Sequence, residues 1–192
     1  MIIEGYLPES IDWSDSNSEE ATIMNYTLEI VNDIDPFNPR DDREFSTIYY
    51  SSSRYRLGDE RVSKEEIDRI IEDKDMVYLP VYAYIHSGVM LNTSGFSCPW
   101  DSGMSGIIAV SKDKIRRIYN TKRVTKKILE QVTSRLKAEV KEFSQYLNGE
   151  VYGFQVKDAN GDIVESCYGF YSEEDAESEG KAVMDYLNKK AA

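Results

Sequence analysis

The chain has 192 residues, of which 41% are hydrophobic and 30% charged, and its formal net charge is −12. This length allows one large domain or two small ones with a real core, which excludes a peptide toxin or a disulfide miniprotein. No apolar run approaches the roughly 20 residues of a membrane-spanning helix, and residues 1–10 do not resemble a secretory signal. We therefore expect a cytoplasmic protein.

The first half of the chain predicts two strands and a helix. Alternating apolar residues indicate a strand over 26–34, and residues 45–50 indicate a second strand after the break at Pro36 and Pro39. The two strands are candidates for a hairpin with a long loop. Residues 63–66 match a capping box, which begins a short helix with an apolar face of isoleucines.

A third strand is predicted over 77–85. It contains Pro80, which cannot donate a hydrogen bond and so indicates a sheet edge or a bulge. Four glycines between positions 88 and 106 predict turns before a short strand over 107–110. Ser111 is expected to cap the next helix.

The second half of the chain is more strongly patterned. A stripe at helical spacing predicts a long amphipathic helix over 123–148; its members are Val124, Ile128, Val132, Leu136, Val140, Phe143 and Leu147. The stripe faces either the core, which we favour, or a partner. Asn160-Gly161 predicts a hairpin of strands 151–157 and 163–170. Ser172 begins a last helix that ends near Lys190. We predict one α+β domain over 1–192, with a largely antiparallel sheet covered by the long helix and the C-terminal helix, and with 1–24 as a mobile acidic segment.

The charge is unevenly distributed along the chain. Residues 1–76 carry a net −12, residues 77–148 a net +6, and residues 149–192 a net −6. The positive charge is concentrated in what we call the basic strip: Lys112, Lys114, Arg116, Arg117, Lys122, Arg123, Lys126 and Lys127. The strip is either a nucleic-acid contact or a solvated helix face whose bases meet the protein's own acids, and the second reading is favoured.

The acidic segments have two readings as well. Closely spaced carboxylates can imitate the phosphates of nucleic acid, although most charge runs are solvated faces. The residues that could contribute to such mimicry are Glu19, Glu20, Glu29, Asp33, Asp35, Glu173, Glu174, Asp175, Glu177 and Glu179.

Catalytic chemistry has little support in the sequence. One histidine and two cysteines without a CxxC exclude a structural zinc site, and both thiols are expected to be free and in the core or at its margin. A thiol site of Cys98, His86 and Asp101 is a minor alternative. Nucleotide, zinc-protease and calcium motifs are missing from the sequence, so we predict a non-enzymatic protein without a cofactor or metal.

Two arginines flank Tyr55. Arg54 and Arg56 could bind a phosphate or a carboxylate of a partner, or form ion pairs with acids of this chain. Internal pairing is the favoured reading.

Several strings between residues 36 and 171 together resemble a family associated with phages and other mobile elements. They are PRDDRE (39–44), RYRLGD (54–59), LPVYAYIHSG (79–88), FSCPWDSG (96–103), VSK (110–112), GEVYGF (149–154) and SCYGFY (166–171). The chain departs from the family pattern between residues 45 and 53. The mobile-element setting implies a counter-defence role in a host bacterial cell, and we suspect a relation to anti-CRISPR proteins that inhibit Cas9-type nucleases.

The resemblance therefore implies a host Cas9-type nuclease, or its guide-RNA complex, as the partner. Candidate partner-binding residues are Trp100, Asp101, Arg54, Arg56, Glu173, Glu174 and Asp175. The alternative is a nucleic-acid-binding accessory protein that uses the basic strip. Trp100 in the FSCPWDSG string is either a buried structural residue, which we favour, or an exposed contact.

Overall fold

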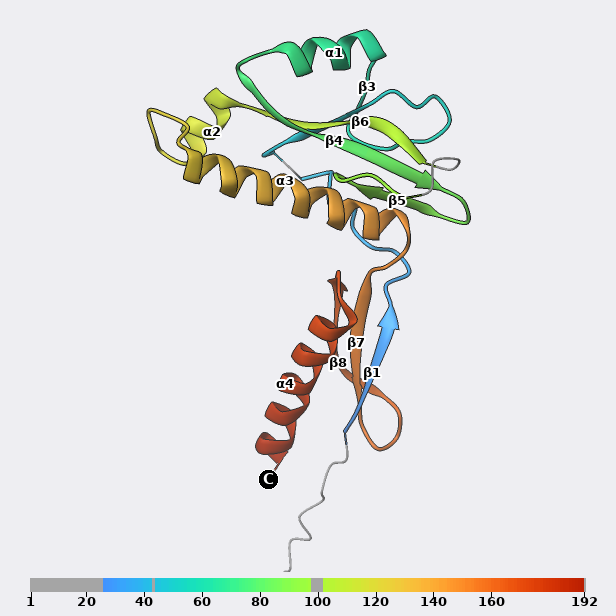
Figure 1. Ribbon diagram of the computed structural model, residues 1–192. Coiled ribbons are helices and arrows are strands. Elements are labelled where there is room, and N and C mark those ends of the chain that lie inside the picture. Colours follow the sequence, from blue (N-terminus) through green and yellow to red (C-terminus); the bar gives the residue numbers. More distant parts are fainter. Residues whose placement is uncertain (1–25, 43, 98–101, 192) are drawn as a thin grey trace, which may run out of the picture.

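The computed structural model describes residues 26–42, 44–97 and 102–191 (Figure 1). These residues form an α+β fold with largely antiparallel strands, as predicted. The strands are divided between two sheets, however, where we expected one. The predicted mobile segment 1–24 lies outside the described residues.

The larger sheet has the strand order β3-β2-β6-β4-β5. Its strands are β2 (Thr47–Tyr50), β3 (Glu60–Arg61), β4 (Met76–Ile85), β5 (Val89–Asn92) and β6 (Ser102–Ser111). The prediction of turns over 88–106 was thus wrong in part, because β5 and the first half of β6 lie there. The prediction rests on glycine as a sign of a turn, but Gly106 lies within β6, where its missing side chain allows close contact with the backbone of β2.

Pro80 lies where β4 has a described neighbouring strand on one side only, so its missing N–H group leaves no strand pairing incomplete on the other side. It lies opposite Ile107 of β6, in a part of β4 that has no other described strand beside it, because β5 pairs only with Tyr82–Ile85. A register shift follows between Val81 and Tyr82. Both features that the proline indicated, an edge and a bulge, are therefore confirmed.

Helices cover both faces of the larger sheet (Figure 1). Ile107 and Ala109 of β6 pack toward α1 (Lys64–Glu72), and Ile108 and Val110 pack toward α3 (Lys126–Leu147). The alternation of a strand explains this arrangement, since successive side chains point to opposite faces. No helix formed by the described residues is long and apolar enough to cross a membrane.

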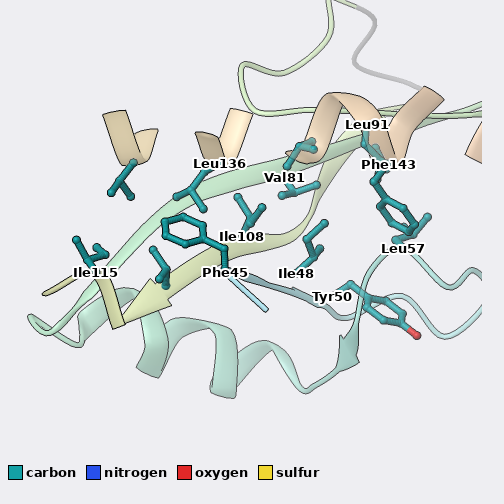
Figure 2. Packing of buried hydrophobic residues seen from close by; sticks show 14 residues of the cluster. Phe45, Ile48, Tyr50, Leu57, Val81, Leu91, Ile108, Ile115, Leu136 and Phe143 are labelled. Carbon is teal, nitrogen blue, oxygen red and sulfur yellow. The ribbon is translucent and has the colours of Figure 1, made fainter. Parts of the chain in front are cut away.

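The main core lies between α3 and the larger sheet (Figure 2). The predicted stripe supplies it with Val132, Leu136, Val140 and Phe143, all buried. Thr125 caps the start of α3 by accepting a hydrogen bond from the Ile128 amide. The stripe is therefore core, as favoured.

The smaller sheet has the order β1-β7-β8. It contains β1 (Thr27–Asn32), β7 (Tyr152–Lys157) and β8 (Ile163–Phe170), and the predicted β7–β8 hairpin is confirmed. The proposed hairpin between the first two predicted strands was wrong. β1 pairs with β7, whereas β2 pairs with β6, so the two strands belong to different sheets.

The last helix, α4 (Glu173–Ala191), covers one face of the smaller sheet. Ser172 accepts a hydrogen bond from the Asp175 amide, which confirms the predicted cap. Gly180 lets the helix lie close to the sheet, because a Cβ there would come within 2.5 Å of the Leu28 side chain. Ala176 is also fully buried.

A hydrogen bond joins the end of α3 to the smaller sheet. The Gln145 side chain donates to the carbonyl of Tyr171, just after β8, at 2.5 Å. The Asp33 amide donates to the Val151 carbonyl at 2.8 Å and extends the pairing of β1 with β7. Gly149 ends the α3 region with a φ of 72°, as the Asn148-Gly149 pair predicted. The end of α3 thus lies beside the start of α4.

Leu136→Ala should lower the free energy of unfolding by about 2–5 kcal/mol, because Leu136 is fully buried beneath the sheet. Urea denaturation followed by circular dichroism measures the change. Leu129→Ala on the exposed side of the same helix is the control and should change it by about 0.5 kcal/mol or less. Equal effects would contradict the assignment of this face to the core.

Candidate binding groove and its buried ion-pair network

An open groove of about 920 Å³ lies where the start of β2, the short helix α2 (Lys112–Ile118) and α3 meet. Its lining is mixed in charge and comprises Asp42, Glu44, Phe45, Ser46, Thr47, Lys114, Arg117, Ile118 and Arg135. Two of these residues, Lys114 and Arg117, belong to the basic strip. The groove therefore joins the strip to the segment before β2.

Local structure of α2 fixes the basic side of the groove. Ser111 accepts a hydrogen bond from the Lys114 amide, which confirms the predicted cap, and Ile115 is fully buried. Lys114, Arg117 and Ile118 are three and four positions apart, so they share one side of the helix. Burial of Ile115 thus orients the side that faces the groove.

The opposite wall is held by Arg40, which is buried. Its guanidinium donates to both carboxylate oxygens of Asp59, at 3.0 and 2.6 Å, and to Glu139 Oε2 at 2.8 Å. It also donates to the Ser46 carbonyl at 2.9 Å. This planar donor set joins the segment before β2 to α3 and to the loop before β3.

Glu139 is the buried anion at the centre of the network. Besides Arg40, its carboxylate accepts a short hydrogen bond from the Ser46 hydroxyl and one from Arg135 Nε at 3.2 Å. Arg135 also stacks on Phe45, with 3.8 Å between Cζ and the ring centroid. The buried network therefore positions a partly exposed arginine at the groove.

The electrostatics keep these groups charged. Burial by itself raises the pKa of Glu139, but hydrogen bonds from Ser46, Arg40 and Arg135, with the charge of Arg40, lower it below its usual value. Burial likewise disfavours the charged form of Arg40, but Asp59 and Glu139 raise its pKa. A carboxylate with a lowered pKa is a poor general base, so we assign the Ser46–Glu139 pair a structural role.

We expected one helix, capped by Ser111, to carry the whole basic strip, and this expectation is wrong. The strip extends over α2, the loop 119–125 and the first turn of α3, because α2 ends at Ile118 and Asn120 has a positive φ. Within the described part of the chain, only Arg116 of the strip forms an ion pair, with Asp113 of its own helix. Contact between the strip and the acids of residues 1–25 lies outside the described residues, so the choice between a solvated face and a nucleic-acid contact stays a prediction.

The other predicted partner-binding residues lie elsewhere. Arg54 is exposed and stacks on Tyr55 at 5.2 Å, and neither Arg54 nor Arg56 forms an ion pair with a described residue. Internal pairing of these arginines, the reading we favoured, is thus not found. Glu173, Glu174 and Asp175 are exposed in the first turn of α4.

The predicted thiol site lies largely outside the described residues. Cys98, Trp100 and Asp101 lie outside the described residues, and His86 is exposed at the end of β4. Cys167 is a free, exposed cysteine on β8, which corrects the expectation that both thiols belong to the core or its margin. No described group of three or more His, Cys, Asp or Glu side chains is arranged to hold a metal ion.

Sequence reasoning missed the ion-pair network. One signal was present, because Glu139 interrupts the apolar stripe of α3 between Leu136 and Val140. A charged residue on a core-facing stripe requires a buried partner. The sequence does not say that this partner is Arg40, 99 positions away.

Comparison of the chain with protein-family models, with curated proteins and with solved structures gives no match in any of the three.

Glu139→Gln should destabilise the protein by about 3 kcal/mol at pH 7, because it removes one of the two carboxylates that pair with the buried Arg40. The folded-state pKa of Glu139 lies below its usual 4.5, so its contribution is present above pH 4.5 and is lost as the pH falls through the folded value. The difference between wild type and variant should therefore shrink in acid.

Chemical denaturation at a series of pH values measures that difference. Glu130→Gln on the exposed side of α3 is the matched control, with an expected change within about 0.5 kcal/mol at every pH. A Glu139→Gln effect that stays constant from neutral to acid pH would show that the charge of Glu139 does not stabilise the fold.

Proposed function

We propose that this chain is a non-enzymatic counter-defence protein of a phage or mobile element, which binds a host Cas9-type nuclease and blocks its use of target DNA. The resemblance of its sequence strings suggests the setting. The observation that carries the proposal is the presence of two exposed surfaces of opposite charge, far apart on one molecule.

The length of α3 separates these surfaces. Lys126 lies in its first turn, and Gln145, near its end, bonds to Tyr171 just before α4. At about 1.5 Å per residue, Lys126 and Gln145 are about 28 Å apart, several times the Debye length of about 8 Å at physiological ionic strength. The two surfaces therefore do not neutralise one another.

The acidic surface matches nucleic acid in its linear charge density. Five exposed carboxylates lie within seven residues of α4: Glu173, Glu174, Asp175, Glu177 and Glu179. Seven residues cover about 10 Å of helix axis, which gives about one charge per 2 Å. Duplex DNA has one per roughly 1.7 Å. Among these five, only Glu177 forms an ion pair with a described residue, Lys181.

A Cas9-type complex offers partners for both surfaces. Its channel for target DNA is basic and would attract the carboxylates of α4, whereas its guide RNA would attract the basic strip. Such complementarity accelerates association and makes it sensitive to salt. A ribonucleoprotein therefore explains both surfaces better than a uniformly charged partner does.

Wild-type protein should co-purify with at least one nuclease of a Cas9-type panel and inhibit its cleavage of target DNA. The triple variant Glu173→Gln/Glu174→Gln/Asp175→Asn should raise the inhibitory concentration at least about tenfold, since it removes three adjacent exposed charges. Cleavage assays at two salt concentrations measure both effects.

The matched control neutralises three exposed acids of α1, in the variant Glu65→Gln/Asp68→Asn/Glu72→Gln, which should inhibit like wild type. Thermal melting of each variant confirms that it is folded. Neither binding nor inhibition with any nuclease of the panel would eliminate the proposed function.

A second candidate is a nucleic-acid-binding accessory protein. The observation that favours it is the basic strip, which is exposed from Arg117 onward and in which only Arg116 pairs with a described acid, beside a groove lined by Lys114, Arg117 and Arg135. This function requires affinity for free nucleic acid. An inhibitor that acts on an assembled nuclease does not.

If the second candidate is correct, wild type shifts a labelled duplex or single strand at low salt, and Lys126→Glu/Lys127→Glu abolishes the shift. Each lost phosphate contact should also reduce the salt slope by about 0.9 on duplex DNA. Lys137→Glu/Lys141→Glu makes the same charge change on exposed positions farther along α3 and should bind like wild type. No shift by the wild type at low salt would reject this candidate.

A further inference from the structure

Strand β8 forms an edge of the smaller sheet with unusual exposure. On one side it pairs with β7, and no described strand lies on its other side. Every residue from Ile163 to Gly169 is exposed, including Ile163 at 53%, Val164 at 40% and Tyr168 at 45%. An edge with unpaired backbone groups and exposed apolar side chains is a template for another strand.

The other sheet edges lack this combination. β3 has two residues and β5 has four, which is short for strand addition, and the open part of β4 contains Pro80, which cannot donate a hydrogen bond. β1 has six residues, but its exposed positions, Thr27, Glu29 and Asn32, are polar. Polar and short edges are the ones that discourage pairing. The described edge best suited to a partner strand is therefore β8.

We propose that β8 pairs antiparallel with β8 of a second copy of this chain, with Ser166 on the two-fold axis, to form a continuous six-stranded sheet. A two-fold axis perpendicular to the sheet makes the interface self-complementary. Register shifts near Val164 and Gly169 leave Glu165–Tyr168 as the regular stretch, which limits the available registers.

The charges exclude one of these registers. An axis at Glu165 would place two carboxylates directly opposite each other, which is destabilising. An axis at Ser166 places Glu165 opposite Cys167 of the second copy. It also lies near the middle of the regular stretch Glu165–Tyr168, so the pairing extends on both sides of the axis.

The charge pattern of α4 complements itself in the same arrangement. Two residues separate the end of β8 from α4, which runs back along the strand. Gly180 of α4 lies beside Phe154, the residue that pairs with Cys167. The axis thus lies near the middle of α4. Both copies of α4 lie on one face and run antiparallel, so the acidic first half of each faces the half that carries Lys189 and Lys190 of the other.

Sedimentation of the full chain over a range of concentrations tests the dimer. Wild type should be a concentration-dependent dimer, and Val164→Lys should raise the dissociation constant at least tenfold, because it places an exposed lysine on the pairing edge. Met90→Lys is the matched control, since Met90 is equally exposed on the edge strand β5 of the other sheet. It should dimerise like wild type, and circular dichroism checks that both variants fold.

Cysteine cross-linking tests the register. In a Cys167→Ser background, Ser166→Cys should give a disulfide-linked dimer on mild oxidation, because directly opposite residues have Cα atoms about 4.5–5.5 Å apart. Wild type, with Cys167 two positions out of alignment with its own copy, should not. A monomeric wild type at high concentration, equal effects of Val164→Lys and Met90→Lys, or efficient oxidation through Cys167 would overturn the proposal.

Discussion

The ion pair between Arg40 and Glu139 is the constraint on which the larger half of the molecule depends. Both side chains are almost fully removed from water, and removing two charges from water costs several kcal/mol per ion unless each is matched. Each is matched several times over. Arg40 also binds Asp59, and the Asp59 carboxylate accepts the Ile48 amide at 2.7 Å. One guanidinium thereby fixes β2, the loop before β3 and α3 relative to one another. The groove is a consequence, because Ser46 and Arg135 are both held by Glu139.

This arrangement also accounts for the separation of charge. Glu139 and Asp59 pair with Arg40 and Arg135 inside the network, so they do not compensate the bases of the strip. The strip is left as an exposed positive region on a protein of net charge −12, and the surplus acids lie on other elements. Two exposed surfaces of opposite sign therefore follow from where the ion pairs form, and the total charge does not reveal them.

Features encoded by neighbouring residues could be predicted from the sequence. The helical stripe of α3, the caps at Ser63, Ser111 and Ser172, and the Asn160-Gly161 hairpin depend on spacings of a few residues. Features that depend on distant partners could not. The pairing of β1 with β7 joins residues 120 or more positions apart, and the apolar alternation of β1 fits either sheet equally well. The position of the strip in the sequence was predicted, but which of its bases form ion pairs depends on the tertiary structure.

The strand order of the smaller sheet, in which β7 lies between β1 and β8, has a consequence for the synthesis of the protein. β1 has no partner until β7 has been synthesised, since Asn32 pairs with Tyr152 and Thr27 with Lys157. At about 5–20 residues per second, the ribosome needs roughly 6–25 seconds to cover that interval. During this time Leu28 and Ile30 have none of the cover that β7 and α4 later provide. The larger sheet, whose strands lie between them in the sequence, can form first and hold the ends of the interval near one another. A shorter β1, or a more polar one, would reduce the hazard of aggregation on the ribosome, but it would also weaken the surface on which α4 packs.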